Sequence, residues 1–239
     1  MTHPRLLRTT FWVASVTAVV AWSGIGSAAT TVKGTVQLPA ELKAGRRFHG
    51  HWRVENTNVA IQPANTRGGT VVVLTGLPYQ ATPPKSVSVE LVGLQANPAT
   101  VVVSEGTVVE FKNSDKVAHD LATPAAPQVM PPQVLAPGSV RKQRFGAQGE
   151  YIVRCSEYPH IAVAVIVTGT PFFGAVDDKG AFRISDVPEG HATLKVWSGE
   201  RWVKQAEVDV PARGLDLTIR VPDASGNVEA TEPAKETTE

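Results

Sequence analysis

One cysteine and a few histidines are the residues of this chain that could do metal or redox chemistry. Cys155 is the only cysteine among 239 residues, which excludes an internal disulfide framework and a zinc site built on paired cysteines. His119 precedes it in the chain and His160 follows it closely. A thiolate and two imidazoles on a rigid scaffold suit copper, and a trigonal His₂Cys set with a weak or absent axial ligand is typical of electron-transfer sites.

Each candidate ligand is predicted to lie where a β-strand runs into a loop. Residues 107–112 form a predicted strand that leads into the loop with His119, and residues 150–155 form one that ends at Cys155. Residues 161–167 are all apolar, which predicts a strand buried on both faces. Two strands of one sandwich can bring His119 and Cys155 together at one end of the fold.

The composition predicts an all-β chain. There are 35 valines against 13 leucines, together with 20 glycines and 18 prolines, and this balance favours strands separated by turns. Lys and Arg number 23 against 22 Asp and Glu, so no strong field favours nucleic acid as a partner. A Pro/Ala-rich connection is predicted over residues 113–135, and further strands over residues 31–37, 49–58, 70–75, 86–92, 100–103, 139–145, 181–184, 192–197, 205–210 and 215–221.

Residues 1–29 have the pattern of a secretory signal. Arg5 and Arg8 precede an apolar stretch over residues 11–22, and Ser27-Ala28-Ala29 places small residues at the cleavage positions. The apolar stretch is shorter than the ~20 residues a spanning helix needs. We therefore expect an exported protein, periplasmic or secreted, with no membrane span in its mature form. An unpaired thiol is unusual in an oxidising compartment, which suggests that something occupies the sulfur.

Two sequence patterns resemble known families. Gly106-x-x-Val109-Glu110-Phe111-x-Asn113-x-Asp115-x-x-x-His119, followed by Gly149-x-Tyr151-x-Val153-x-Cys155, resembles the cupredoxins (plastocyanin and azurin), and is most similar to periplasmic plastocyanin-like proteins of the methylamine-utilisation type. The pattern Asp177-x-x-Gly180-x-Phe182-x-Ile184 with Val187-Pro188-x-Gly190 resembles the carboxypeptidase-regulatory-like (transthyretin-like) β module, which is not a peptidase. The resemblance implies a Greek-key cupredoxin β-sandwich followed by a small C-terminal β-sandwich module.

The cupredoxin resemblance implies a copper site with His119 and Cys155 as ligands. Many relatives carry a histidine three residues after the cysteine and a methionine three further on, where this chain has Tyr158 and Ile161. The Cys-x-x-x-x-His spacing of azurin-like members instead makes His160 the third ligand, and the methionine position then falls near Ala164. The hypothesis is a His119/Cys155/His160 copper site without an axial methionine, with Tyr158 as a weaker alternative donor.

The resulting prediction is a one-electron carrier, not an enzyme, with a redox partner such as a cytochrome. The alternatives are a copper-free degenerate cupredoxin that acts as a structural or binding module in the cell envelope, and a copper storage or delivery protein. The expected division is a signal peptide (1–29), an N-terminal β extension on or beside the cupredoxin (30–80), the cupredoxin domain (81–168), the regulatory-like module (169–222) and a disordered acidic tail (223–239). Asp120 is expected to orient the His119 loop or to be exposed. Glu110 and Asp115 are expected to be solvated or to cap a turn, and surface or packing roles are expected for His49, His51, Met130, His191, Trp197 and Trp202.

Overall fold

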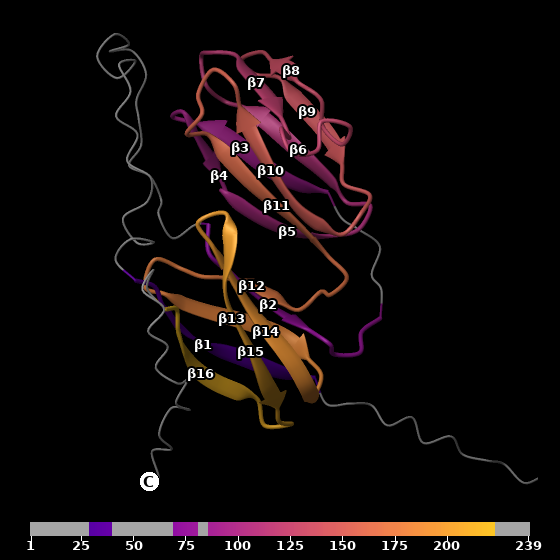
Figure 1. The fold of residues 1–239 in the computed structure, drawn as a ribbon, viewed down its shortest axis with the longest axis vertical. Helices are drawn as coiled ribbons and strands as arrows, with labels where there is room; N and C mark the ends of the chain where they lie inside the picture. Colours follow the sequence, from indigo (N-terminus) through magenta and orange to yellow (C-terminus); the bar gives the residue numbers. More distant parts are fainter. Residues whose placement is uncertain (1–28, 40–68, 81–85, 223–239) are drawn as a thin grey trace, which may run out of the picture.

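The computed structural model describes residues 29–39, 69–80 and 86–222, and every regular element within these ranges is a β-strand. The all-β class predicted from the sequence is confirmed. Figure 1 shows two β-domains, one formed by β3 to β11 and the other by β1, β2 and β12 to β16. Residues 1–28, the predicted strand over 49–58 with its two histidines, and the predicted tail over 223–239 lie outside the described residues.

The first domain, residues 86–168, is a β-sandwich that we call the sandwich. One of its sheets has the order β5 (Thr100–Ser104), β11 (Ala162–Thr168), β10 (Gly149–Cys155), β7 (His119–Ala122) and β8 (Gln133–Leu135). The other has the order β4 (Gln95–Asn97), β3 (Val87–Val92), β6 (Val108–Asn113) and β9 (Val140–Arg144). Their inner faces enclose one apolar core that includes Phe111, Leu121, Phe145 and Cys155.

Strands β7 and β8 lie inside the segment 113–135 that the sequence predicted to be an irregular connection. Each is short, and β7 is held by its neighbours: Arg154 and Cys155 of β10 pair with Ala122 and Leu121, and β8 pairs on the other side. The prolines of this segment lie between the two strands and therefore interrupt no ladder. As a result, His119 is the first residue of a strand and not a loop residue.

The second domain has a chain order that the sequence did not predict. β1 (Thr30–Gln37) is the central strand of one sheet, antiparallel to β13 (Ala181–Val187) and parallel to β16 (Leu215–Arg220). In the other sheet β2 (Val71–Thr75) lies between β12 (Phe173–Ala175) and β14 (Gly190–Ser198), which pairs with β15 (Arg201–Val210). We call this the discontinuous domain, because the sandwich is inserted into the chain between β2 and β12.

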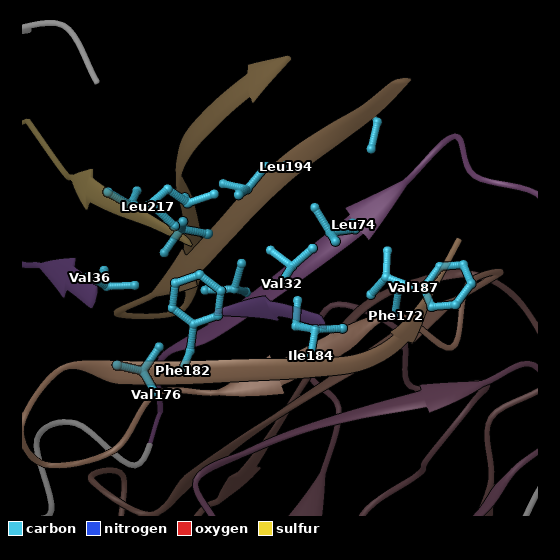
Figure 2. Packing of buried hydrophobic residues seen from close by; sticks show 14 of the residues in the cluster. Val32, Val36, Leu74, Phe172, Val176, Phe182, Ile184, Val187, Leu194 and Leu217 are labelled. Carbon is cyan, nitrogen blue, oxygen red and sulfur yellow. The ribbon is translucent and has the colours of Figure 1, made fainter. Parts of the chain in front are cut away.

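The core of the discontinuous domain is apolar throughout. Figure 2 shows side chains from early and late parts of the chain in one cluster, with Val32 and Leu74 packed among Phe172, Phe182 and Leu217. All of these side chains are nearly or fully buried. Strands β1 and β2 therefore complete this core, in place of the separate extension expected for residues 30–80. The pairing of strands so distant in sequence leaves no local signal, which is why a linear division missed it.

The two domains meet at a third buried group, which we call the interdomain cluster. It joins Val71, Val73 and Trp197 of the discontinuous domain to Val102, Ala164 and Ile166 of the sandwich. Polar contacts surround it: Trp202 Nε1 donates to Glu150 Oε1 at 2.7 Å, and Arg154 forms an ion pair with Glu200 at 2.5 Å. The prediction that β11 is buried on both faces is confirmed, since its alternate residues face the sandwich core and this cluster.

Within the described ranges, no helix is long and apolar enough to cross a membrane.

Candidate metal centre

The side chain of Asn113, the last residue of β6, forms hydrogen bonds with the loop that leads to His119. Its amide nitrogen donates to Val117 O at 2.8 Å and Leu135 O at 2.9 Å, and its amide oxygen accepts from Asp115 N at 2.9 Å. Asn113 is fully buried, so these bonds satisfy an otherwise costly polar group. This side chain therefore fixes the position of both Asp115 and the start of β7.

The structure brings together two of the three predicted ligands, His119 and Cys155. Cys155 pairs with Leu121 across the β10–β7 ladder, and His119 lies two residues before Leu121, so all three side chains share the inner face of the sheet. The Nδ1 atom of His119 lies 3.7 Å from Cys155 Sγ, and both residues are almost completely buried, with exposed fractions of 0% and 1%.

Asp115 is a neighbour of the His119 ring that sequence reasoning assigned to a turn or to solvent. Its Oδ2 atom lies 3.0 Å from His119 Nε2. The carboxylate also accepts backbone hydrogen bonds from the β3–β4 turn, from Gly93 N at 2.6 Å and Leu94 N at 3.2 Å. The signal was present in the sequence as Asn113-x-Asp115-x-x-x-His119, but nothing local shows that the carboxylate turns inward.

His160, the third predicted ligand, is held against the same β3–β4 turn. Its Nε2 atom donates to Leu94 O at 3.0 Å, which places the lone pair of the neutral ring on Nδ1. Burial lowers the pKa of His160, the hydrogen bond to Leu94 opposes this, and the nearby His119 lowers the pKa further. A neutral imidazole is the form that binds metals.

Tyr158 lies between the two histidines. Its ring centroid is 5.5 Å from that of His119 and 6.3 Å from that of His160, with edge-to-face geometry in both pairs. Among the described residues, no group of three or more His, Cys, Asp or Glu side chains converges on one point as a metal site would require. His119 and Cys155 are thus in contact, and His160 and Tyr158 are the two candidates for a third ligand.

The His119–Cys155 pair fits a single metal ion. Metal–nitrogen and metal–sulfur bonds of about 2.0 and 2.3 Å, at an angle between tetrahedral and trigonal, place the two donors about 3.5–3.7 Å apart. The Nδ1–Sγ separation of 3.7 Å lies within that interval. The thioether position counted from the sequence does not contribute, because Ala164 faces the interdomain cluster on the opposite side of β11 from the core.

Asp115, His119 and Cys155 form a carboxylate–imidazole–thiol series. A cysteine nucleophile in an enzyme has the same arrangement. The exposed fractions of Asp115, His119 and Cys155 are 9%, 0% and 1%. A substrate carbonyl must reach the attacking sulfur, and here the sulfur is enclosed by the apolar core. The burial therefore argues against covalent catalysis and favours a group small enough to be held inside the sandwich.

Asp120 connects the two ligand-bearing segments. Its backbone oxygen accepts from Ser156 N at 3.0 Å, and its carboxylate accepts from Ser156 Oγ at 2.9 Å. Asp120 follows His119 and Ser156 follows Cys155, so these bonds fix the spacing of the two candidate ligands. The expected orienting role of Asp120 agrees with this geometry.

The remaining candidates that the structure describes take the surface and packing roles expected of them. Met130 is fully buried in the sandwich core, and Glu110 forms an ion pair with Lys142 at 2.9 Å. His191 is on the surface between Asp209 and Glu207, at 2.8 and 3.3 Å. Trp197 and Trp202 pack edge to face with centroids 5.2 Å apart, at the boundary between the domains.

Comparison with known proteins finds similarity only among solved structures. No family model and no curated protein matches the chain. Similar structures include a Cu-containing nitrite reductase from Thermus scotoductus SA-01, with 27% identity over 40% of this chain and a TM-score of 0.32. Amicyanin from Paracoccus versutus has 18% identity over 35% of this chain, and a purple cupredoxin from Nitrosopumilus maritimus 21% over 34%, each with a TM-score of 0.32.

These alignments differ in how much of the other chain they span. The match covers 25% of the nitrite reductase, 81% of amicyanin and 99% of the purple cupredoxin. The two facing sheets of the sandwich and their common apolar core agree with the predicted all-β sandwich.

Proposed function

We propose that this chain is an exported copper-binding protein that works as a one-electron carrier. The single observation that carries the proposal is the buried contact between His119 Nδ1 and Cys155 Sγ at 3.7 Å. Copper, when bound, would supply reversible one-electron chemistry. The chain's own residues supply a thiolate and an imidazole lone pair in a site closed to water.

His160 is the third ligand of the proposed site. Its Nε2 proton is engaged by Leu94 O, so the nitrogen left to face a metal is Nδ1, as it is for His119. Ligation would require the His160 ring to move toward Cys155. Tyr158 is the competing donor, but a phenol must lose its proton to bind a metal as an anion, whereas the neutral His160 ring already offers a lone pair.

Export and a partner belong to the same proposal. The pattern of residues 1–29 supports transport out of the cytoplasm, and a redox partner such as a cytochrome would exchange electrons with the site. The likeness of residues 169–222 to a carboxypeptidase-regulatory-like module suggests a non-catalytic β module. The alternative is a copper-free protein in which both domains serve binding or structure.

Copper reconstitution tests the proposal. The wild-type protein should bind one copper ion per chain, show an absorption band from thiolate-to-copper charge transfer, and titrate reversibly as a one-electron couple. Cys155→Ser should abolish the band. Glu157→Gln, an exposed change in the same loop, should leave it intact.

Two further variants decide the third ligand. His160→Ala should weaken copper binding and shift the band, while Tyr158→Phe should preserve both. The reverse result would assign the place to Tyr158. Absence of both the band and stoichiometric copper in the wild-type protein would leave the copper-free module, and tight Cu(I) binding without reversible electron exchange would indicate storage or delivery.

A further inference from the structure

We infer that Asp115 is a positioning residue that holds the proton of the His119 ring on Nε2 and so presents the Nδ1 lone pair to Cys155. The inference deepens the proposed function and rests on it only for its metal-binding consequence. The tautomer of the metal-free protein is a separate claim that stands on the contacts of Asp115 alone.

The carboxylate of Asp115 can only accept hydrogen bonds. Its Oδ2 atom lies 3.0 Å from His119 Nε2, so this nitrogen must carry the hydrogen. The neutral ring then has its lone pair on Nδ1, where the Cys155 Sγ atom lies 3.7 Å away. In the metal-free protein the thiol hydrogen is donated to this lone pair, and a metal ion would replace that hydrogen.

The orientation of the carboxylate is fixed from its other side. Oδ1 accepts from Gly93 N at 2.6 Å and from Leu94 N at 3.4 Å, and Oδ2 accepts from Leu94 N at 3.2 Å. Gly93 and Leu94 both have positive φ angles, 62° and 58°, and form a tight turn that directs their N–H groups at the carboxylate. These bonds therefore keep Oδ2 of Asp115 directed at the His119 ring.

The same turn also holds His160, because Leu94 O accepts the hydrogen of His160 Nε2 at 3.0 Å. One two-residue turn thus determines the tautomer of both histidines, directly for His160 and through Asp115 for His119. Both rings are left with Nδ1 as the nitrogen that can bind a metal ion.

The variant Asp115→Asn should reverse the tautomer of His119. The amide oxygen should keep the place of Oδ1, because that atom accepts the shortest bond, from Gly93 N at 2.6 Å, whereas the place of Oδ2 loses only the longer bond from Leu94 N at 3.2 Å. The NH₂ group then faces His119 Nε2, which must become the acceptor and pass its hydrogen to Nδ1. The lone pair would no longer face Cys155.

Glu157→Gln is the matched control. It is the same carboxylate-to-amide change close to the site, but the Glu157 side chain is exposed and takes no part in holding the His119 ring. A general effect of removing a negative charge would appear in both variants, whereas the positioning effect would appear in Asp115→Asn alone.

Nitrogen-15 NMR of the imidazoles in the metal-free protein is the primary test. We expect His119 to be protonated on Nε2 in the wild-type protein and in Glu157→Gln, and on Nδ1 in Asp115→Asn. A wild-type ring protonated on Nδ1 would overturn the inference even if Asp115→Asn failed to fold, and so would an unchanged tautomer in a folded Asp115→Asn.

Copper affinity is the second readout. Loss of a hydrogen-bond partner behind a ligating histidine typically costs 10–100-fold in metal affinity, and we expect a loss of about that size in Asp115→Asn only. Equal affinity in the two variants would overturn the metal-binding consequence. If the wild-type protein bound no copper but the tautomers were as expected, the proposed function would fail while the role of Asp115 stood.

Discussion

The two domains are both β-sheet structures with valine-rich cores, but they bury very different polar groups. Among the described residues of the discontinuous domain, the buried polar side chains are all hydroxyls, namely Thr70, Thr170 and Ser198. In the sandwich they include an aspartate, a histidine, an arginine and an asparagine, all between residues 113 and 141. Each of these ionisable or amide groups needs compensating hydrogen bonds to be buried without a large cost.

The difference shows that a β-domain of this size does not need such groups to be stable. The buried polar groups of the sandwich gather around the segment that carries His119, and they bond to it or to its neighbours. Because the discontinuous domain folds with a similar core and without these groups, their presence around His119 points to a specialised role for this part of the sandwich.

The largest expected effect of a single substitution is in the discontinuous domain, where two neighbouring strands approach closely at Gly34. A Cβ atom on Gly34 of β1 would lie 1.8 Å from Leu217 O of the neighbouring strand. Gly34→Ala should therefore lower the free energy of unfolding by at least about 3 kcal/mol, as measured by chemical denaturation. Gly146→Ala in the sandwich is the control, since its Cβ would have no atom within 4 Å. Equal stability of the two variants would contradict the central position of β1.

An intermediate effect is expected where the sandwich uses a buried charge. The Arg141 guanidinium donates to Leu121 O at 2.7 Å and Pro131 O at 2.8 Å. These bonds join β9 of one sheet to β7 and to the segment before β8 of the other sheet. Arg141→Met keeps much of the side-chain volume but leaves two carbonyls without their donor, and should cost about 2–3 kcal/mol in the free energy of unfolding. The neighbouring exposed change Lys142→Met should cost far less, and similar losses in both would show that Arg141 serves packing alone.

The smallest effect is expected at His191, the exposed histidine of the discontinuous domain. The hydrogen bond to Asp209 raises the pKa of His191, and the charges of Asp209 and Glu207 add to the effect. A raised pKa means that protonated His191 stabilises the fold at pH below about 6.5, and that this contribution is lost as pH rises through the folded-state pKa. An NMR titration should give a midpoint above about 6.5 that falls in Asp209→Asn; a midpoint at or below this value in the wild-type protein would refute the interaction.

The sequence was informative wherever the signal was local. Alternating and continuous valine runs located most of the strands, and a strand ending at Cys155 followed from residues 150–155 alone. The pairing of His119 with Cys155 followed from a spacing pattern typical of one fold. Most predicted strand ends agree with the structure to within two residues, although β13 continues three residues beyond the predicted end at 184 and β15 begins four residues before the predicted start at 205.

The sequence failed where a distant partner decides the structure. β7 is a strand because β10 and β8 pair with it, although its Pro-rich surroundings predict a loop. Asp115 turns inward because a turn some twenty residues earlier offers it two N–H groups. The central place of β1 depends on β13 and β16, at the other end of the chain. None of these contacts leaves a trace in the local pattern.

The insertion of the sandwich between β2 and β12 has a consequence for how the molecule could be taken apart. β2 and β12 are antiparallel neighbours, with Val73 opposite Phe173 and a hydrogen bond from Leu74 N to Phe172 O at 2.8 Å. The points where the chain leaves and re-enters the discontinuous domain thus lie side by side, close enough for a short hairpin to bridge them. The sandwich can be excised as one continuous stretch without breaking a ladder of the discontinuous domain. Its removal would expose the apolar residues around Val71, Val73 and Trp197.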